Sequence, residues 1–172
     1  MALTGPQDSL PARAKSEGSA IRAFCTFRAD DRLYGIDVTS LREVSTNITI
    51  TPVPHAPPAV RGLANLRSQI LLVLDLRPLL GLPPQACTAD SRLIIFKSTV
   101  VEDAGILVDR GGDIVQAPLD RIEDATEAGP ASREPDTPAA SPLVVGICKL
   151  QNELMMIIDA RRLADTIANL MR

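Results

Sequence analysis

Tryptophan is absent from this sequence, and its aromatic side chains are one tyrosine and three phenylalanines among 172 residues. Nucleic-acid bases stack on aromatic side chains, so a stacking platform for single strands has almost no material here. Positive charge is not in excess either, because 18 Lys and Arg stand against 21 Asp and Glu. Proteins that bind nucleic acids derive much of their affinity from a basic face that neutralises phosphates. Both shortages argue against nucleic acid as a partner.

The residue types that carry most catalysis and metal binding are also scarce. A single histidine, His55, disfavours a His-based metal cluster and a Ser-His-Asp relay. The three cysteines, Cys25, Cys87 and Cys148, are odd in number and irregularly spaced, as expected of reduced thiols in a cytoplasm. Sequence motifs for phosphate loops, zinc helices and nucleophile elbows are missing. We therefore expect no active site, no cofactor and no metal, in a protein that is not an enzyme.

Long apolar runs are missing as well. No run is longer than that of residues 70–74, which is far below the ~20 residues that a membrane-spanning helix needs. The first twenty residues lack the apolar core of a signal peptide. The sequence therefore predicts a cytoplasmic protein that does not insert into a membrane directly.

Two stretches rich in proline, small residues and charge show no hydrophobic periodicity. Residues 1–21 are predicted to form a flexible tail. Residues 123–141 are acidic and rich in Pro and Ala, and they exceed the usual loop length of a compact domain. We expect this second stretch to be a surface loop or flap within one folded domain, residues 22–168.

The remaining sequence consists mostly of short alternating or apolar runs that are typical of β-strands. The predicted strands are residues 22–28, 33–38, 42–46, 60–66, 69–75, 92–97, 104–109, 113–116, 143–150 and 153–159. The one long helical pattern follows Asp159, where Leu163, Ile167, Leu170 and Met171 share a face. Many short strands with few helices indicate an all-β barrel or sandwich with a C-terminal helix.

An internal repeat refines this fold prediction. Residues 60–80 align without gaps on residues 144–164, at a constant offset of 84 positions. Gly62 then meets Gly146, and the Asp-x-Arg-x-Leu motif that begins at Asp75 meets the one that begins at Asp159. Residues 34–38 resemble residues 104–108 at an offset of 70. A half of this size does not easily fold alone, so we expect two similar five-stranded barrels around a shared core.

Two charged residues stand out on the predicted surface. Glu43 follows a Leu-Arg pair, and Arg67 ends the segment Gly62-Leu-Ala-Asn-Leu-Arg67. Their spacing alone indicates no more than exposed charge on strands. Mixed charges beside apolar groups nevertheless suit protein recognition, in which a few Arg and apolar anchors dominate the affinity.

Several segments, taken in order, carry a resemblance to a known family. They are Phe24-Cys-Thr-Phe, Leu33-Tyr-Gly-Ile-Asp-Val, Leu41-Arg-Glu-Val, Thr51-Pro-Val-Pro-His-Ala-Pro-Pro-Ala-Val-Arg-Gly, the block that ends at Arg67, and residues 146–163. This succession resembles the CheW family, the adaptors of bacterial chemosensory arrays, over residues 22–168. The resemblance implies a CheW-like domain of two SH3-like five-stranded barrels, in agreement with the repeat.

The resemblance also implies a function and its site. A non-enzymatic CheW-like adaptor couples methyl-accepting chemoreceptors to a CheA-type histidine kinase, and it is held near the inner membrane by receptor arrays. One barrel binds the regulatory domain of the kinase, the groove between the barrels takes the receptor's cytoplasmic tip, and CheW-like neighbours complete a ring. In the family, the residues at Glu43 and Arg67 are important for these contacts, with Leu41, Gly62 and Asn65 close by. We expect an Arg67–Glu43 pair that fixes the edge of the groove.

One departure from the family pattern bears on the choice of partner. The family usually has glycine after Asn-Leu-Arg, whereas this chain has Ser68. Serine accepts a positive φ less readily than glycine, so either the turn or the partner surface is expected to differ. Two alternatives to the adaptor remain at this point. One is a small-ligand barrel or an enzyme with a cryptic site, and the other is a decoy that binds the kinase but not the receptor.

Overall fold

The computed structural model describes residues 19–125 and 141–172. The predicted N-terminal tail and the predicted acidic loop lie mostly outside these described residues. At their borders, the first strand, β1, begins at Ile21, and a short strand, β10, occupies Ile122–Asp124. Within the described ranges, no helix is long and apolar enough to cross a membrane.

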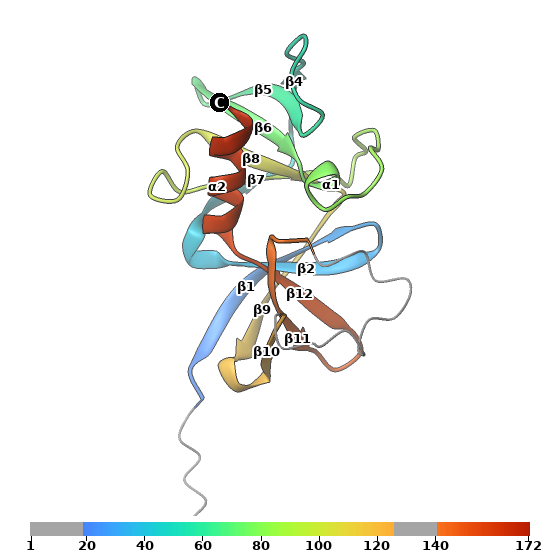
Figure 1. The fold of residues 1–172 in the computed structure, drawn as a ribbon, viewed down its shortest axis with the longest axis vertical. Helices are drawn as coiled ribbons and strands as arrows, with labels where there is room; N and C mark the ends of the chain where they lie inside the picture. Colours follow the sequence, from blue (N-terminus) through green and yellow to red (C-terminus); the bar gives the residue numbers. More distant parts are fainter. Residues whose placement is uncertain (1–18, 126–140) are drawn as a thin grey trace, which may run out of the picture.

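Strands make up about half of the described chain (Figure 1). They are β1 Ile21–Ala29, β2 Arg32–Asp37, β3 Leu41–Ser45, β4 Ile50–Thr51, β5 Val60–Leu66, β6 Gln69–Asp75, β7 Arg92–Phe96, β8 Ala104–Val108, β9 Arg110–Pro118, β10 Ile122–Asp124, β11 Val144–Lys149 and β12 Leu154–Ile158. The helices are α1 Leu76–Leu79 and α2 Ala160–Leu170, with 3-10 turns η1 Val38–Ser40 and η2 Leu119–Arg121. The all-β prediction with a C-terminal helix is confirmed.

The described strands form two sheets of six strands each. The β1 sheet has the order β10-β11-β12-β2-β1-β9, and the β5 sheet has the order β3-β7-β8-β6-β5-β4. The sequence predicted about five strands for each half. The additional strands are β4, with two residues, and β10, with three, which are too short to show a hydrophobic alternation.

The two sheets are built alike, and each takes strands from both halves of the chain. Parallel pairing places Leu72 of β6 opposite Ala104 of β8, and Met156 of β12 opposite Tyr34 of β2. These pairs correspond to each other at the offsets of 84 and 70 that the sequence repeat gives. The β1–β2 hairpin therefore joins strands of the second half, whereas the β7–β8 hairpin joins strands of the first. Neither half completes its sheet without the other.

Local features of the repeat also match. The register of β5 against β6 shifts at Gly62, and that of β11 against β12 shifts at Gly146, as in a β-bulge. Asp75 and Asp159 cap α1 and α2, each accepting a hydrogen bond from the backbone N–H two residues on, at 3.0 and 2.7 Å. The predicted repeat is thus present in the backbone as well as in the sequence.

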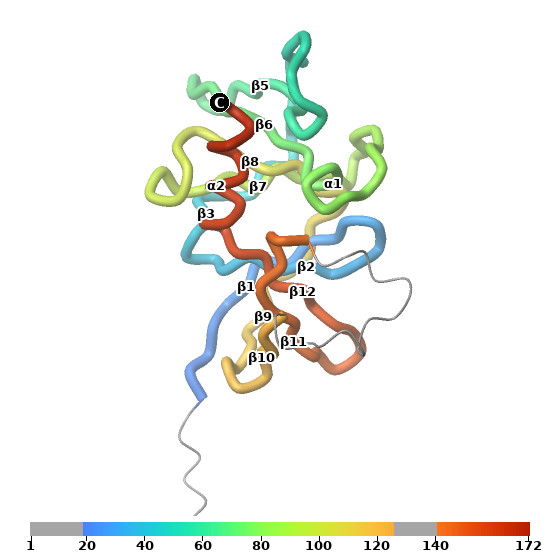
Figure 2. The backbone as a smooth tube through the Cα atoms, in the orientation of Figure 1, coloured from blue at the N-terminus to red at the C-terminus, as the bar shows by residue number. Residues whose placement is uncertain are grey.

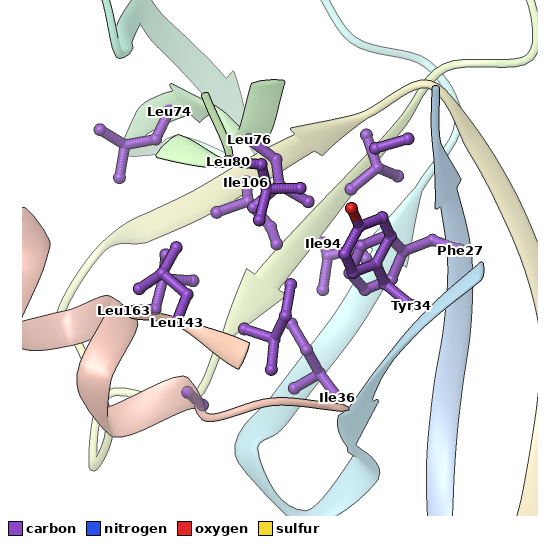
Figure 3. Packing of buried hydrophobic residues seen from close by; sticks show 14 of the residues in the cluster. Phe27, Tyr34, Ile36, Leu74, Leu76, Leu80, Ile94, Ile106, Leu143 and Leu163 are labelled. Atoms are coloured by element: carbon purple, nitrogen blue, oxygen red, sulfur yellow. The ribbon is translucent and has the colours of Figure 1, made fainter. Parts of the chain in front are cut away.

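A shared apolar core lies between the sheets (Figure 3). Phe27, Tyr34 and Ile36 enter it from the β1 sheet, and residues such as Ile94 and Ile106 enter it from the β5 sheet. Each sheet also encloses a small apolar cluster of its own. The tube in Figure 2 shows α2 running from the junction of the sheets alongside the β5 sheet. A core that both sheets share makes one folding unit of the two barrels.

Helix α2 seals one side of this core. Leu163 and Ile167 are buried in it, and Leu170 packs against it in part. The sequence placed Met171 on the same buried face, and that prediction is wrong. The helix ends at Leu170, so Met171 is its C-cap and is 61% exposed. The helical spacing of apolar residues therefore predicted burial correctly up to Leu170, where the helix ends.

Candidate partner-binding site

The β5–β6 hairpin carries the strongest candidate residue at its tip. Leu66 pairs with Gln69, which leaves Arg67 and Ser68 as a two-residue turn. Their φ angles are +50° and +67°, as in a type I′ turn, whose backbone matches the twist of the flanking strands. Serine therefore takes up the positive φ that glycine would adopt more easily. The turn is present despite the departure at this position.

Arg67 reaches from this turn to β3. Its Nη2 lies 3.1 Å from Oε2 of Glu43, so the predicted ion pair is present. The two partners differ in environment, because the Arg67 side chain is 80% exposed and that of Glu43 only 23%. Oε1 of Glu43 is buried and has no hydrogen-bond partner among the described residues. Glu43 thus contacts the guanidinium of an arginine whose side chain is largely exposed to solvent.

A second contact ties the same two elements together. Arg42 donates from Nη1 to Oε1 of Gln69 at 2.8 Å, and Gln69 in turn donates from Nε2 to Asp103. Strand β3 is at one end of the sheet order, and the β5–β6 hairpin is near the other end. The two polar contacts therefore close the β5 sheet into a barrel around the small apolar cluster inside it.

The other three predicted residues have different positions. Asn65 is exposed on β5, two residues before Arg67. Leu41 is half-buried and packs against the shared core from β3. Gly62 is buried at a φ of +147°, where an added Cβ would lie 2.2 Å from the carbonyl oxygen of Thr51. The structure brings Arg67 and Glu43 together, whereas Asn65 lies on the outer face of the hairpin, and Leu41 and Gly62 lie inside.

The same surface includes apolar side chains that sequence reasoning did not single out. Leu63 is 38% exposed and Ile70 is 55% exposed. Ile70 pairs across the hairpin with Asn65, and Leu63 lies two residues from Asn65, so all three share the outer face of the hairpin. The alternation of Leu63 and Asn65 with Ala64, which is buried, could have indicated that Leu63 faces solvent. Exposed apolar groups beside a charged turn are typical of protein-recognition surfaces.

Two hollows on the protein lie away from the surface formed by the β5–β6 hairpin. One of about 420 Å³ lies between β9 and the β11–β12 turn, and one of about 390 Å³ lies beside Arg77 and Asp109. Neither hollow is lined by Arg67 or Glu43. The described residues contain no group of three or more His, Cys, Asp or Glu placed to hold a metal ion.

The environments of two cysteines disfavour nucleophilic chemistry. Burial raises the pKa of the Cys25 thiol. Burial also raises the pKa of the Cys148 thiol, with the charge of Arg121 acting in the opposite direction. The thiolate is the nucleophile of cysteine chemistry, so a raised pKa keeps both side chains protonated and unreactive near neutral pH.

Residues 23–168 match the family model of the CheW-like domain. The chain belongs to the CheW family. It is 32% identical to the chemotaxis protein CheW of Bacillus subtilis (strain 168), over 81% of this chain and 84% of that protein. It is 31% identical to the probable chemotaxis protein CheW of Rhizobium etli, over 66% of this chain and 72% of that protein.

A solved CheW structure has the same fold. The crystal structure of scaffolding protein TtCheW from Thermoanaerobacter tengcongensis superposes with a TM-score of 0.67 at 27% sequence identity, over 81% of this chain and 89% of that chain. CheW proteins are named as chemotaxis and scaffolding proteins rather than enzymes. The predicted family, the SH3-like fold and the non-enzymatic class are therefore confirmed, and the chain is a member of a family of chemotaxis scaffold proteins.

Proposed function

We propose that this protein couples methyl-accepting chemoreceptors to a CheA-type histidine kinase in a chemotaxis or related chemosensory pathway. The observation that carries the proposal is the β5–β6 hairpin, which presents Arg67 to solvent while Glu43 anchors it. Membership of the CheW family supports the pathway. Arginine beside exposed apolar side chains is the residue combination that most often dominates the affinity of a protein interface.

The five candidate residues have separate tasks in this proposal. Arg67 and Asn65 contact a partner directly, together with the apolar face of Leu63 and Ile70. Glu43 positions Arg67, because its carboxylate is mostly buried and lies 3.1 Å from the guanidinium. Leu41 and Gly62 keep β3 and β5 in place beneath the contact surface.

The partners would be the regulatory domain of the kinase and the cytoplasmic signalling tip of the receptor. CheW-like domains of neighbouring molecules would complete a ring in the array. Through these partners, the protein would work in the cytoplasm at the face of the inner membrane. It would neither insert into the membrane nor bind nucleic acid.

Isothermal titration calorimetry of the full chain against each partner tests the proposal. The Arg67→Ala variant is compared with Arg110→Ala, which removes another exposed arginine from the β1 sheet, 56% exposed against 80% for Arg67. We expect the unaltered protein to bind both the kinase regulatory domain and the receptor tip. Arg67→Ala should weaken binding to at least one of them by about tenfold, and Arg110→Ala should leave both affinities unchanged.

Two results would contradict the proposal. Equal affinities for Arg67→Ala and the unaltered protein would remove Arg67 from the interface. Binding to the kinase without binding to the receptor would replace coupling with the decoy function, because a decoy occupies the kinase without connecting it to a signal.

A further inference from the structure

Arg77 is a buried arginine at the junction of the two sheets. It lies in α1, directly after the last strand of the β5–β6 hairpin, and its side chain is only 9% exposed. Its Nε and Nη2 each lie 2.9 Å from an oxygen of Asp109, as a two-pronged ion pair. Its Nη1 donates to the carbonyl oxygen of Pro83 at 2.7 Å. Asp109 and Pro83 therefore hold the guanidinium from two sides.

Asp109 marks the point where the chain leaves one sheet and enters the other. It separates β8 of the β5 sheet from β9 of the β1 sheet. Its Oδ2 accepts a hydrogen bond from the backbone N–H of Asp30 at 2.9 Å, and its own N–H donates to the carbonyl oxygen of Arg28 at 3.2 Å. Arg28 and Asp30 belong to β1 and the turn that follows it. Asp109 is thus bound to both sheets at once.

The carboxylate of Asp30 completes this cluster. It lies 3.5 Å from Nη2 of Arg77, so the turn after β1 contacts α1 directly as well as through Asp109. The hydrogen bond to Asp109 raises the pKa of Arg77, while burial acts in the opposite direction. The ion pair with Asp109 therefore favours the charged form of the guanidinium.

The repeat shows that α1 and its cap do not by themselves require such a cluster. Arg161 is the counterpart of Arg77 at the offset of 84, and it follows the same kind of aspartate cap. Arg161 is exposed on α2, whereas Arg77 is buried. The burial of Arg77 is thus a property of this junction rather than of the Asp-x-Arg-x-Leu motif.

We propose that Arg77 is a positioning residue that fixes the angle between the β1 sheet and the β5 sheet by clamping Asp109 to the turn after β1. The apolar core between the sheets supplies attraction that is not directional. A two-pronged arginine–carboxylate pair adds a defined geometry, and lysine does not reproduce it. Replacing a buried ion pair by apolar residues of similar volume is often neutral or even stabilising, so the role proposed for Arg77 rests on the geometry of its contacts and not on a gain in stability.

The angle between the sheets is a property of the free protein, so it can be measured without any partner. Residual dipolar couplings of backbone amides in the full chain report how each sheet is oriented in a weakly aligned sample. In the unaltered protein, one alignment tensor should fit the amides of both sheets. The Arg77→Lys variant keeps the positive charge but cannot form the two-pronged ion pair with Asp109. In this variant, the alignment tensors fitted to the two sheets should be rotated relative to each other by more than the fitting error.

Asp31→Asn is the matched control. Asp31 is next to Asp30 and also has a positive φ, +61°, but its side chain is 97% exposed and contacts Arg110 rather than Arg77. One tensor should still fit both sheets in this control. If Arg77→Lys does not fold, Asp109→Asn replaces it, because asparagine keeps the shape and one acceptor oxygen while weakening the pair.

A single unaltered tensor in folded Arg77→Lys or Asp109→Asn would overturn the proposal, since the apolar core alone would then set the angle. Separate tensors in Asp31→Asn would also overturn it, because the angle would then respond to any change in this turn. The couplings are measured on the protein alone, so a failure here would leave the proposed partners untouched.

Discussion

The two sheets share a backbone plan but differ in how their hairpins are held. In the β5 sheet, the exposed Arg67 at the tip is held from below by Glu43. At the corresponding tip of the β1 sheet, Glu153 accepts both of its ion-pair hydrogen bonds from Arg28, at 2.8 and 3.0 Å. The ion pair between Arg28 and Glu153 thus lies within the β1 sheet, and both of its side chains are partly buried. In the β5 sheet the arginine is ion-paired as well, but its side chain is 80% exposed, against 31% for Arg28.

The apolar part of the two tips is nearly the same. Ile70 of β6 and Leu154 of β12 correspond at the offset of 84, and they are 55% and 53% exposed. An exposed apolar side chain is therefore common to both tips, while the exposed arginine distinguishes the tip of the β5–β6 hairpin. If the tip of the β5–β6 hairpin binds a partner as proposed, we expect the charge to set specificity and the apolar groups to make a general contribution to affinity.

The largest expected difference between the halves concerns their bulge glycines. Gly62→Ala should lower the free energy of unfolding by about 3 kcal/mol or more, because the new Cβ would collide with backbone at a strained φ. In Gly146→Ala the nearest atom is 3.1 Å away, on the side chain of Ile122, so we expect a loss of about 1 kcal/mol or less. Urea denaturation measures both, and equal losses would mean that the two bulges are equivalent.

A smaller effect is expected for coupling between the paired charges. A double-mutant cycle of Arg67→Ala and Glu43→Ala on partner binding should give a coupling free energy of about 1 kcal/mol, because Glu43 acts through Arg67. The same cycle on Arg28 and Glu153 should give none, since that pair faces no partner in this account. Additive losses for Arg67 and Glu43 would show that the ion pair does not shape the binding surface.

The smallest effect is expected at the turn residue itself. Ser68→Gly should raise the free energy of unfolding by about 0.5 to 1 kcal/mol, because glycine adopts the positive φ of +67° without strain. Asn152 is the corresponding residue of the β11–β12 turn and does not have a positive φ. Asn152→Gly should therefore bring no gain. Thermal unfolding followed by circular dichroism distinguishes the two, and destabilisation by Ser68→Gly would show that the serine has a contact of its own.

Much of the fold could be predicted because it depends on patterns between residues that are close together in the sequence. Hydrophobic alternation placed most strands, and the repeat aligned Asp75 with Asp159, which the structure shows as the caps of the two helices. The sequence repeat, with its offsets of 84 and 70, predicted that the two halves are built alike. Alternation indicates which face of a strand is buried but not which strand pairs with which, so the exchange of hairpins between the halves had no signal in the pattern.

The candidate site could be predicted only in part, for the same reason. The resemblance to CheW proteins drew attention to Arg67 and Glu43, which are 24 residues apart in the sequence and which no local pattern joins. The Arg77–Asp109 pair had neither a resemblance nor a local pattern behind it, since its members are 32 residues apart. Contacts of this kind depend on how the sheets meet.

Receptor-dependent activity of the kinase tests the central claim most directly. Autophosphorylation of a CheA-type kinase is measured with receptor-containing membranes, with and without this protein. We expect the receptor to change kinase activity only when the protein is present, Arg67→Ala to lose this effect, and Arg110→Ala to keep it. Kinase activity that responds to the receptor equally well without the protein, or that never responds in its presence, would contradict the account.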